Sequence, residues 1–468
     1  MSGKNTEKLR VKHWPEPSLL FKRGLTENII DPRYGLSKFG PYDYNVVQRD
    51  FDEVELKVIC YEHGEYPQEM LKLLKKLKEK VESKYRVHRM YPYEGFKELY
   101  KADIILPDAS DFFYLKRSDI SEILSSEDYD EFLNKFKELY SQKIQNILDN
   151  GYNKNTVICV HLPQELETKF QKFKGASELR GLGLRSIIKA IGVNKHVKTQ
   201  IITKKALKPQ DLADVLWNMS LAIYVKAGGA PWRLREIPPT SAFIGIRHGI
   251  RRDENGQLIA IGVVEIVNRY GEHISITAVD FSDKDLQYPD FFSSKPYLSK
   301  TGMRRLIMKA ISEFEGDLQS VVIHRTLDFK EEEIDGITSA LKSADVNLVH
   351  IVGNPDERIL SDKSPKRGTF VYDENGNRGW LYTTGYTESA KMYLGIGTPK
   401  PLGLVKCYGE RDLEELALQV FALTKMDWNT IRPMLRDPVT IKYAEKVVDL
   451  IKVGLKTEFT VKDMRYYF

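Results

Sequence analysis

Apolar positions in the first half of the chain form short continuous runs separated by longer amphipathic stretches. The runs have the length of buried strands, and stretches such as 67–83 repeat their apolar residues at helical spacing. The expected strands are 54–60, 103–107, 156–162 and 198–202, and the expected helices are 67–83, 125–148, 178–191 and 211–226. Regular alternation of this kind is typical of a parallel, Rossmann-like sheet covered by helices.

The pattern changes after Gly228 and Gly229, where strands begin to follow one another directly. The expected strands are 242–248, 258–267 and 274–280, followed by a helix at 302–314, a strand at 321–324, a helix at 331–344 and a strand at 346–352. Asp253-Glu254-Asn255-Gly256 and Tyr270-Gly271-Glu272 separate the first three strands and are typical hairpin signals. Three antiparallel strands followed by αβαβ is the element order of an RNase H-like fold, so the sequence predicts an α/β protein of two domains.

The first 50 residues have a different character, because they are rich in proline, glycine and aromatic residues. Pro32-Arg33-Tyr34-Gly35 and Phe39-Gly40-Pro41-Tyr42-Asp43 are expected to be turns between short extended pieces. This segment is therefore predicted to be an arm that packs on a larger body.

The charge of the chain changes this picture only locally. A net charge of +5 over 468 residues does not by itself indicate a nucleic-acid ligand. Between Lys169 and Lys208, however, eleven Lys and Arg residues occur with a single acid, Glu178. Such a run is either a solvated face or part of a surface that binds anions.

Cysteine usage and hydropathy exclude several classes of protein. Cys60, Cys159 and Cys407 lie far apart without paired spacing, so neither a zinc site nor a disulfide framework is expected. No apolar run reaches the roughly 18 residues of a membrane-spanning helix, and the first residues do not resemble a signal peptide. A soluble, cytoplasmic protein without membrane insertion is therefore expected.

Four polar residues in and after the basic run could together hold a phosphate, which needs several donors at one place. Arg185 and Lys189 are four residues apart and share one face of an expected helix. Gln200 lies at the end of an expected strand, where its amide can donate a hydrogen bond, and Lys226 closes the next expected helix. From the residues alone, the alternative that these side chains are simply solvent-exposed stays open.

Five short segments together resemble one family of proteins. They are Gly397-Thr398-Pro399-Lys400-Pro401-Leu402, Ser320-Val321-Val322-Ile323-His324-Arg325, Tyr91-Pro92-Tyr93-Glu94-Gly95-Phe96, Phe39-Gly40-Pro41-Tyr42-Asp43 and Leu423-Thr424-Lys425-Met426-Asp427-Trp428-Asn429. In combination they look like short prokaryotic Argonautes, which contain a MID and a PIWI domain but no PAZ domain. The resemblance implies a Rossmann-like MID domain over 51–230, an RNase H-like PIWI domain over 231–468, and an arm over 1–50 that packs on the PIWI domain and on a partner.

The resemblance gives the four polar residues a role. Argonaute MID domains hold the 5′-phosphate of a guide strand with a tyrosine, a lysine four residues on, a glutamine and a later lysine. This chain resembles that pattern at Arg185, Lys189, Gln200 and Lys226, with Arg185 in place of the usual aromatic residue or histidine. The resemblance also implies that the Phe468 carboxylate and the Gln200 side chain hold a structural Mg²⁺ against the phosphate. Alternatively, the terminal aromatic residues are packed for stability.

The same resemblance implies that the PIWI domain is catalytically inactive. RNase H-type cleavage uses two metal ions held by several carboxylates. Two positions where active relatives carry aspartate are here Arg247 and Thr326. Asp280 and Asp328 lie nearby in the sequence and are the candidate substitutes if the chain does cleave.

The resemblance to short prokaryotic Argonautes implies a guide-binding subunit of a prokaryotic immune system that is not itself an enzyme. Its expected ligands are a 5′-phosphorylated guide RNA and complementary target DNA from an invader. Its expected partner, in a heterodimer for antiviral defence, is a separately encoded effector with a PAZ-analogous domain fused to a TIR, sirtuin-like or nuclease domain. Two alternatives stay open: a guide-directed nuclease that uses a divalent metal, and a scaffold that only holds its partner while the pocket is vestigial.

Overall fold

The computed structural model describes residues 9–46, 49–84, 91–173, 182–236, 240–252, 258–287, 296–312, 314, 318–357, 359, 365–386 and 398–468. The chain divides into two compact units. The five-stranded unit comprises residues 20–232, 428–431 and 449–468, and the nine-stranded unit comprises residues 1–19, 233–427 and 432–448. The main division after Trp232 lies close to the boundary expected after Ala230, but each unit is built from separate stretches of the chain.

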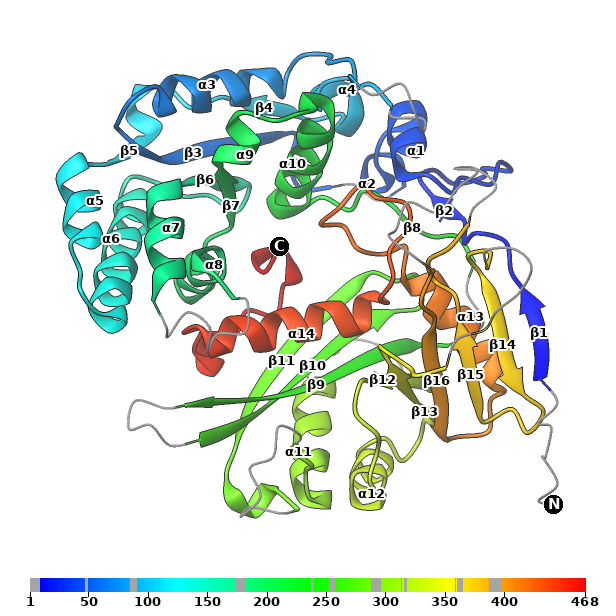
Figure 1. Cartoon of the computed structure of the whole chain (residues 1–468). Helices are drawn as coiled ribbons and strands as arrows, with labels where there is room; N and C mark the ends of the chain where they lie inside the picture. The colour runs from blue at the N-terminus through cyan, green and yellow to red at the C-terminus, as the bar shows by residue number, and fades with distance from the viewer. Residues whose placement is uncertain are drawn as a thin grey trace. The chain divides into compact units, whose positions relative to one another are not determined.

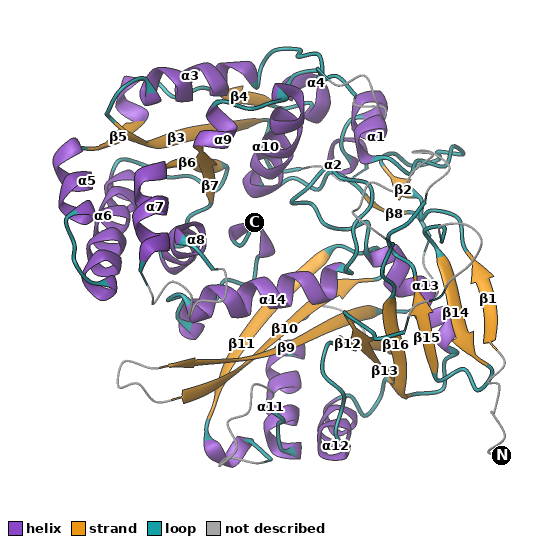
Figure 2. Ribbon diagram, viewed as in Figure 1, coloured by secondary structure: helices purple, strands orange, loops and turns teal. Residues whose placement is uncertain are grey.

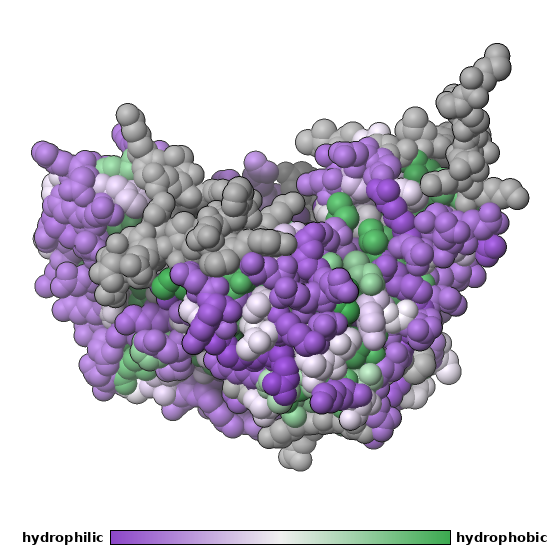
Figure 3. Space-filling view, turned by 90° about the horizontal axis from the view of Figure 1, so that it is seen from below, coloured by the Kyte–Doolittle hydropathy of each residue, from purple (hydrophilic) through white to green (hydrophobic). Residues whose placement is uncertain are grey.

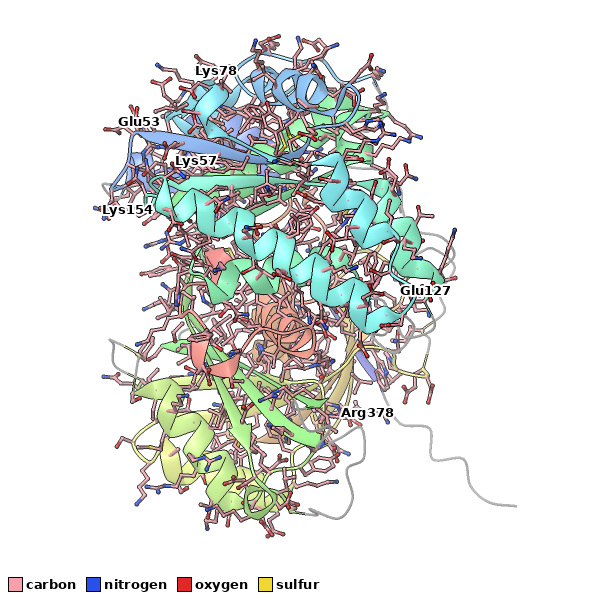
Figure 4. The ribbon with its side chains drawn as sticks, turned by 90° about the vertical axis from the view of Figure 1, so that its left-hand side faces the viewer. Glu53, Lys57, Lys78, Glu127, Lys154 and Arg378 are labelled. Atoms are coloured by element: carbon pink, nitrogen blue, oxygen red, sulfur yellow. The ribbon has the colours of Figure 1, made fainter. Side chains whose placement is uncertain are left out.

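The sheet of the five-stranded unit is parallel throughout, as predicted. Its strands are β3 (Glu53–Tyr61), β4 (Asp103–Ile105), β5 (Phe112–Leu115), β6 (Thr156–Leu162) and β7 (Thr199–Thr203). They follow the order β4-β3-β6-β7, and β5 pairs with the second half of β3. β6 is buried at every position, which is typical of a parallel strand with helices on both faces. Figure 4 shows Glu53, at the start of β3, and Lys154, just before β6, at the same end of this unit.

Helices cover this sheet (Figure 1 and Figure 2). They are α3 (Tyr66–Lys76), α4 (Phe96–Tyr100), α5 (Arg117–Leu124), α6 (Tyr129–Asp149), α7 (Gln164–Lys172), α8 (Leu184–Asn194), α9 (Lys204–Leu207) and α10 (Leu212–Ala227). α6 and α8 pack against each other, whereas α3 packs on β3 and α9. α10 contacts β3, β6 and β7, so it spans the sheet towards the strand β7 at its edge.

Two helices replace the turns that the sequence predicted near the start of the chain. α1 (Pro32–Phe39) begins after Asp31, whose side chain accepts a hydrogen bond from the N–H of Arg33 at 2.9 Å, and it ends at Gly40, which has a φ of 74°. α2 (Tyr42–Asn45) follows at once. Pro32 is therefore the first residue of a helix and Gly40 its end, positions that proline and glycine favour as much as they favour turns. Of the predicted arm, residues 20–46 belong to the five-stranded unit and only residues 9–19 to the nine-stranded unit.

The structure also ends one predicted helix earlier and starts another later than the sequence indicated. α3 ends at Lys76, although 67–83 was expected to be helical, because Val81 pairs with Tyr93 through two backbone hydrogen bonds. The helix expected at 125–148 begins only at Tyr129, because the side chain of Asp128 caps α6 by accepting a hydrogen bond from the N–H of Glu131 at 2.8 Å. Tertiary pairing and capping thus override helical periodicity at both places.

The RNase H-like element order is confirmed in the nine-stranded unit. Its strands are β1 (Leu9–His13), β9 (Ala242–Arg252), β10 (Leu258–Asn268), β11 (His273–Phe281), β12 (Ser320–Arg325), β13 (Asp345–Val352), β14 (Thr369–Asp373), β15 (Arg378–Leu381) and β16 (Leu402–Tyr408), and its helices include α11 (Lys300–Ile311), α12 (Glu331–Ala340) and α13 (Leu413–Leu423). β9, β10 and β11 form an antiparallel meander, and β9, β12 and β13 are parallel. The sheet order is β1-β14-β15-β16-β13-β12-β9-β10-β11. The hairpin turn expected at 253–256, the start of the helix expected at 178–191, and Gly397 lie outside the described residues.

The two faces of the nine-stranded sheet carry different helices. α11 and α12 cover an apolar core that includes Ile244 and Ile246. On the other face, α14 (Val439–Lys452) begins so close to β9 that a Cβ added to Gly245 would lie 1.9 Å from the backbone oxygen of Thr440. Because side chains alternate along a strand, Arg247 lies on the same face as Gly245. Figure 3 views the molecule from below, where α11 and α12 lie, and its described surface is mainly hydrophilic. Among the described helices, none is long and apolar enough to cross a membrane.

The burial of His161 on β6 should make the stability of the five-stranded unit depend on pH. The ring is fully buried, its Nδ1 accepts a hydrogen bond from the N–H of Tyr61 at 3.4 Å, and burial lowers the pKa of His161 from 6.5 to about 4. Unfolding lets the ring take up a proton, so stability should fall as the pH drops below 6.5, by about 2 kcal/mol at pH 5. In urea titrations at pH 5 and pH 7, His161→Asn should remove this loss. The exposed His63→Asn should retain it, and equal losses in both variants would contradict the assignment.

Candidate functional site

Lys226 and Gln200 are in direct contact at the start of β7. Lys226 lies in the last turn of α10 and is 1% exposed. Its ammonium group donates a hydrogen bond to Oε1 of Gln200, which is the second residue of β7. α10 runs back across the sheet after β7, and its C-terminal end therefore returns to the amino end of this strand. Two polar residues from different elements meet there.

Lys189 approaches the same strand from α8. It is 9% exposed, and its ammonium group donates a hydrogen bond to the backbone oxygen of Thr199, the residue before Gln200. α8 precedes β7 in the chain and packs on it. The structure thus brings three of the four predicted phosphate-binding residues to the amino end of β7, where they supply two ammonium groups and one amide.

Arg185 is not brought into this group. It lies one helical turn before Lys189, and its side chain is 57% exposed. Its Nε is 3.6 Å from Oε1 of Glu167 on α7. An exposed ion pair of this length contributes little to stability. The i,i+4 spacing places Arg185 and Lys189 on one side of the helix, but only the Lys189 side chain is directed at β7, whereas Arg185 is directed at Glu167.

The burial of Lys189 and Lys226 makes their position unusual. Transfer of an ammonium group out of water is unfavourable unless hydrogen bonds and opposite charge compensate for it. Lys189 donates to Thr199 and Lys226 donates to Gln200, so the two ammonium groups bind neighbouring residues of β7. A phosphate with several acceptor oxygens is chemically suited to bind two ammonium groups at this end of β7.

Lys198 is a further basic residue at this end of the sheet that the sequence interpretation did not select. It precedes β7, is 4% exposed, and donates a hydrogen bond to the backbone oxygen of Lys154 at 2.5 Å. Burial, and after it the neighbouring charge of Arg465, lower the pKa of Lys198 to about 8. The signal that could have found it is strand alternation, because Lys198 lies two residues before Gln200 and thus on the same side of the strand.

The C-terminal segment packs beside the same residues. The short helix η5 (Met464–Tyr466) contacts both α8 and α10. Arg465 donates a hydrogen bond to the backbone oxygen of Gly228 at 2.7 Å, and Phe468 is 3% exposed. Oε1 of Gln200 accepts from Lys226, so in this arrangement that oxygen does not suit a cation ligand. The Mg²⁺ ion and the Phe468 carboxylate as its ligand stay predictions, and phosphate binding by the two lysines does not require them.

In the nine-stranded unit, the two residues at the predicted catalytic positions meet. Arg247 donates hydrogen bonds to Oγ1 of Thr326 through Nη1 and to Glu445 through Nη2, the latter at 2.8 Å. The parallel pairing of β9 with β12 explains the meeting, because it places Ile246 opposite Arg325. A guanidinium group held by a carboxylate therefore occupies this position, and a metal ion placed there would meet a positive charge.

The two alternative carboxylates are each engaged with other partners. Asp328 accepts hydrogen bonds from the hydroxyl of Tyr297 and, at 2.8 Å, from Lys330; burial opposes its ionisation, but these bonds lower the pKa of Asp328 overall. Asp280 pairs with Arg251 at 2.8 Å. Within the described part of the chain, no group of three or more His, Cys, Asp or Glu side chains is arranged to hold a metal ion. Catalytic inactivity itself stays a prediction.

Sequence comparison relates this chain to Argonaute proteins. Over 292 residues it is 24% identical to the protein argonaute of Aquifex aeolicus (strain VF5), and the match covers 61% of this chain and 38% of that protein. It is also 24% identical over 274 residues to the protein argonaute of Cereibacter sphaeroides, covering 52% of this chain and 34% of that protein. The matches thus span little more than a third of these curated relatives. No family model matches the chain.

Solved structures extend the similarity over nearly the whole chain. The Argonaute of Clostridium butyricum bound to a guide DNA and a 19-mer target DNA superposes with a TM-score of 0.65 at 18% identity, covering 96% of this chain and 54% of that one. The crystal structure of Drosophila Piwi gives a TM-score of 0.62 at 15% identity, covering 98% and 56%. The chain therefore has the MID–PIWI fold of Argonaute and Piwi proteins over about half of their length, as a short Argonaute is expected to have.

Proposed function

We propose that this chain binds a 5′-phosphorylated guide RNA and pairs it with complementary target DNA without cleaving it. The observation that carries the proposal is the convergence of Lys226, Gln200 and Lys189 on the amino end of β7. The Argonaute of Clostridium butyricum, whose fold this chain shares, is bound to a guide DNA and a target DNA, which supports a paired guide and target strand as the ligand here but not the choice of RNA for the guide.

The chemistry of the group favours a terminal phosphate over an internal one. A terminal phosphate carries more negative charge and one more free oxygen, so it should bind two buried ammonium groups more tightly than an internal phosphate does. Contacts of this kind fix the end and the backbone of the strand but do not read its sequence. Base pairing between guide and target then supplies sequence specificity, as in other RNA-guided proteins.

The arrangement around Arg247 supports binding without cleavage. Two-metal hydrolysis needs carboxylates that hold the metal ions beside the attacked phosphate. Here a guanidinium group stands at one predicted position and hydrogen-bonds to Thr326 at the other. Its positive charge would repel the metal ions but would favour a nucleic-acid backbone.

An immune role and an effector partner rest on the resemblance to short prokaryotic Argonautes. The solved relatives are longer than this chain, which covers 54–56% of them. We propose that a separately encoded protein with a PAZ-analogous domain supplies the remaining nucleic-acid contacts, and that its TIR, sirtuin-like or nuclease domain responds when the target pairs with the guide. Copurification of such a protein with the tagged chain from its native host would support this part of the proposal.

Binding measurements with matched guides test the central claim. Two RNA guides of one sequence, with a 5′-phosphate or a 5′-hydroxyl and a fluorophore at the 3′ end, are titrated with the protein and followed by anisotropy. The phosphorylated guide should bind at least about tenfold more tightly, because two charge-assisted contacts are added. Equal affinities would support a scaffold with a vestigial pocket.

The same complex tests whether the chain cleaves. Labelled target DNA, complementary or scrambled, is added with Mg²⁺ or Mn²⁺ and analysed on a denaturing gel. The complementary strand should bind selectively and stay intact. Cleavage at one fixed phosphodiester would establish the guide-directed nuclease instead.

A further inference from the structure

We propose that Asp43 in the N-terminal arm is a positioning residue for Lys226, and this inference rests on the proposed guide-binding function. Asp43 lies on α2 and is 5% exposed. A buried carboxylate is unfavourable unless donors satisfy both of its oxygens. Its donors come from the end of α10 and from the segment that follows, which is the part of the chain that holds Lys226.

Asp43 bonds to both sides of the turn that ends α10. Its Oδ1 accepts a hydrogen bond from the hydroxyl of Tyr224, and its Oδ2 accepts from the N–H of Ala230 at 2.8 Å. The backbone strengthens this link, because the N–H of Asp43 donates to the oxygen of Ala230 at 3.2 Å and the N–H of Tyr42 donates to the oxygen of Pro231 at 2.9 Å. The arm therefore clamps residues 230–231 while its carboxylate holds Tyr224.

The turn between these two contacts is tight and leaves little room for adjustment. Gly228 has a φ of 127°, and the N–H of Gly229 donates to the oxygen of Tyr224 at 3.0 Å. A Cβ added to Gly229 would lie 2.3 Å from the ring of Tyr224. Tyr224 and the turn thus move together, and Lys226 lies between them in the sequence. Displacement of either contact of Asp43 would shift the Lys226 ammonium relative to Gln200.

A second set of contacts also holds the Tyr224 side chain. The ring stacks on Tyr100 with centroids 4.5 Å apart. Nη1 of Arg49 donates to the backbone oxygen of Tyr100 at 2.7 Å and to the hydroxyl oxygen of Tyr224 at 3.4 Å. That hydroxyl therefore accepts from a guanidinium while it donates to Asp43. A carboxylate suits this arrangement better than an amide, because both of its oxygens accept.

The expected consequence is selective for the phosphate. In Asp43→Ala both contacts are lost, Lys226 is no longer held against Gln200, and the preference for a 5′-phosphorylated guide over a 5′-hydroxyl guide should fall about tenfold. Affinity for the 5′-hydroxyl guide should stay within about twofold. Asp43→Asn keeps one acceptor for the N–H of Ala230, so the preference should fall only about threefold, which is half of the tenfold effect on a logarithmic scale.

Asp211 offers a matched control on the same helix. It is 7% exposed and caps the other end of α10, where it accepts hydrogen bonds from the N–H of Ala213 at 3.0 Å and from the hydroxyl of Ser83 at 2.6 Å. Asp211→Ala should lower the unfolding temperature by an amount similar to Asp43→Ala and leave the phosphate preference unchanged. If both variants keep the full preference, Asp43 contributes to stability alone and the inference is wrong.

The binding data distinguish an incorrect role for Asp43 from an incorrect proposed function. If only the role of Asp43 is wrong, the wild type prefers the 5′-phosphorylated guide, Lys226→Ala removes this preference, and Asp43→Ala retains it. Loss of the proposed function would appear as no preference in the wild type. If Asp43→Ala does not fold, Tyr224→Phe removes one of the two contacts with the carboxylate in place. It should reduce the preference about threefold, and an unchanged preference would overturn the inference.

Discussion

Replacing Lys226 with methionine is expected to weaken binding of a 5′-phosphorylated guide roughly 30- to 150-fold while leaving binding of a 5′-hydroxyl guide nearly unchanged. A hydrogen bond from a buried charged donor contributes about 2–3 kcal/mol, and each 1.4 kcal/mol is a factor of about ten. Methionine fills the same space without the charge, so the 1% exposed position is not left as a cavity. Anisotropy titrations with the two guides measure both affinities directly.

Two other cationic residues make this prediction discriminating. Lys205 on α9 belongs to the same basic stretch but is exposed, and Lys205→Met should change the phosphate preference less than about twofold. Arg185→Met should have an effect of less than about fivefold, because Arg185 is exposed and pairs with Glu167. Equal losses in all three variants would mean that net charge, rather than the group at β7, holds the guide.

Much of the fold follows from the sequence wherever burial is continuous. β6 begins and ends at the expected residues because every position is apolar or buried, and a strand covered on both faces leaves a plain signal. The order of β9, β10 and β11 is equally readable, since hairpin signals separate long apolar strands. The ends of helices are harder to predict. α3 stops at Lys76 because of the distant partner Tyr93, which no local pattern indicates.

The candidate site likewise contains residues that the sequence could indicate and residues that it could not. Lys189, Gln200 and Lys226 could be selected because the resemblance to Argonautes names residue types at a recognisable spacing. Their polarity and position alone were equally consistent with exposed side chains. Asp43 could not be found in this way, because its partner Tyr224 is 181 residues away and both lie in segments without a motif for phosphate. Such contacts depend on how the arm folds back on the unit, which only the structure shows.

The nine-stranded unit contains a second buried arrangement that the sequence did not reveal, a carboxylate between two cations. Glu16, in the segment after β1, has Oε1 2.7 Å from Nε of Arg367 and Oε2 2.7 Å from Nζ of Lys425. The cation side chains are 0% and 2% exposed. Burial raises the pKa of Glu16, but the charges of Lys425 and Arg367 outweigh this and lower it overall. The carboxylate is therefore ionised, and its loss would leave two buried positive charges facing each other.

Glu16→Gln is accordingly expected to lower the free energy of unfolding by about 3–5 kcal/mol, because it leaves the buried charges of Arg367 and Lys425 without the carboxylate that compensates them. Urea titration at pH 7, followed by tryptophan fluorescence, measures the change. Asp335→Asn removes an exposed pair with Lys300, whose side chains are 54% and 57% exposed, and should lose less than about 1 kcal/mol. Because the pKa of Glu16 is lowered in the folded state, its contribution is present above pH 4.5 and disappears as the carboxylate becomes protonated below that value. The difference in free energy of unfolding between wild type and Glu16→Gln should therefore shrink in acid. If this difference is small at pH 7, or does not change with pH, the ion pairs of Glu16 with Arg367 and Lys425 do not stabilise the fold.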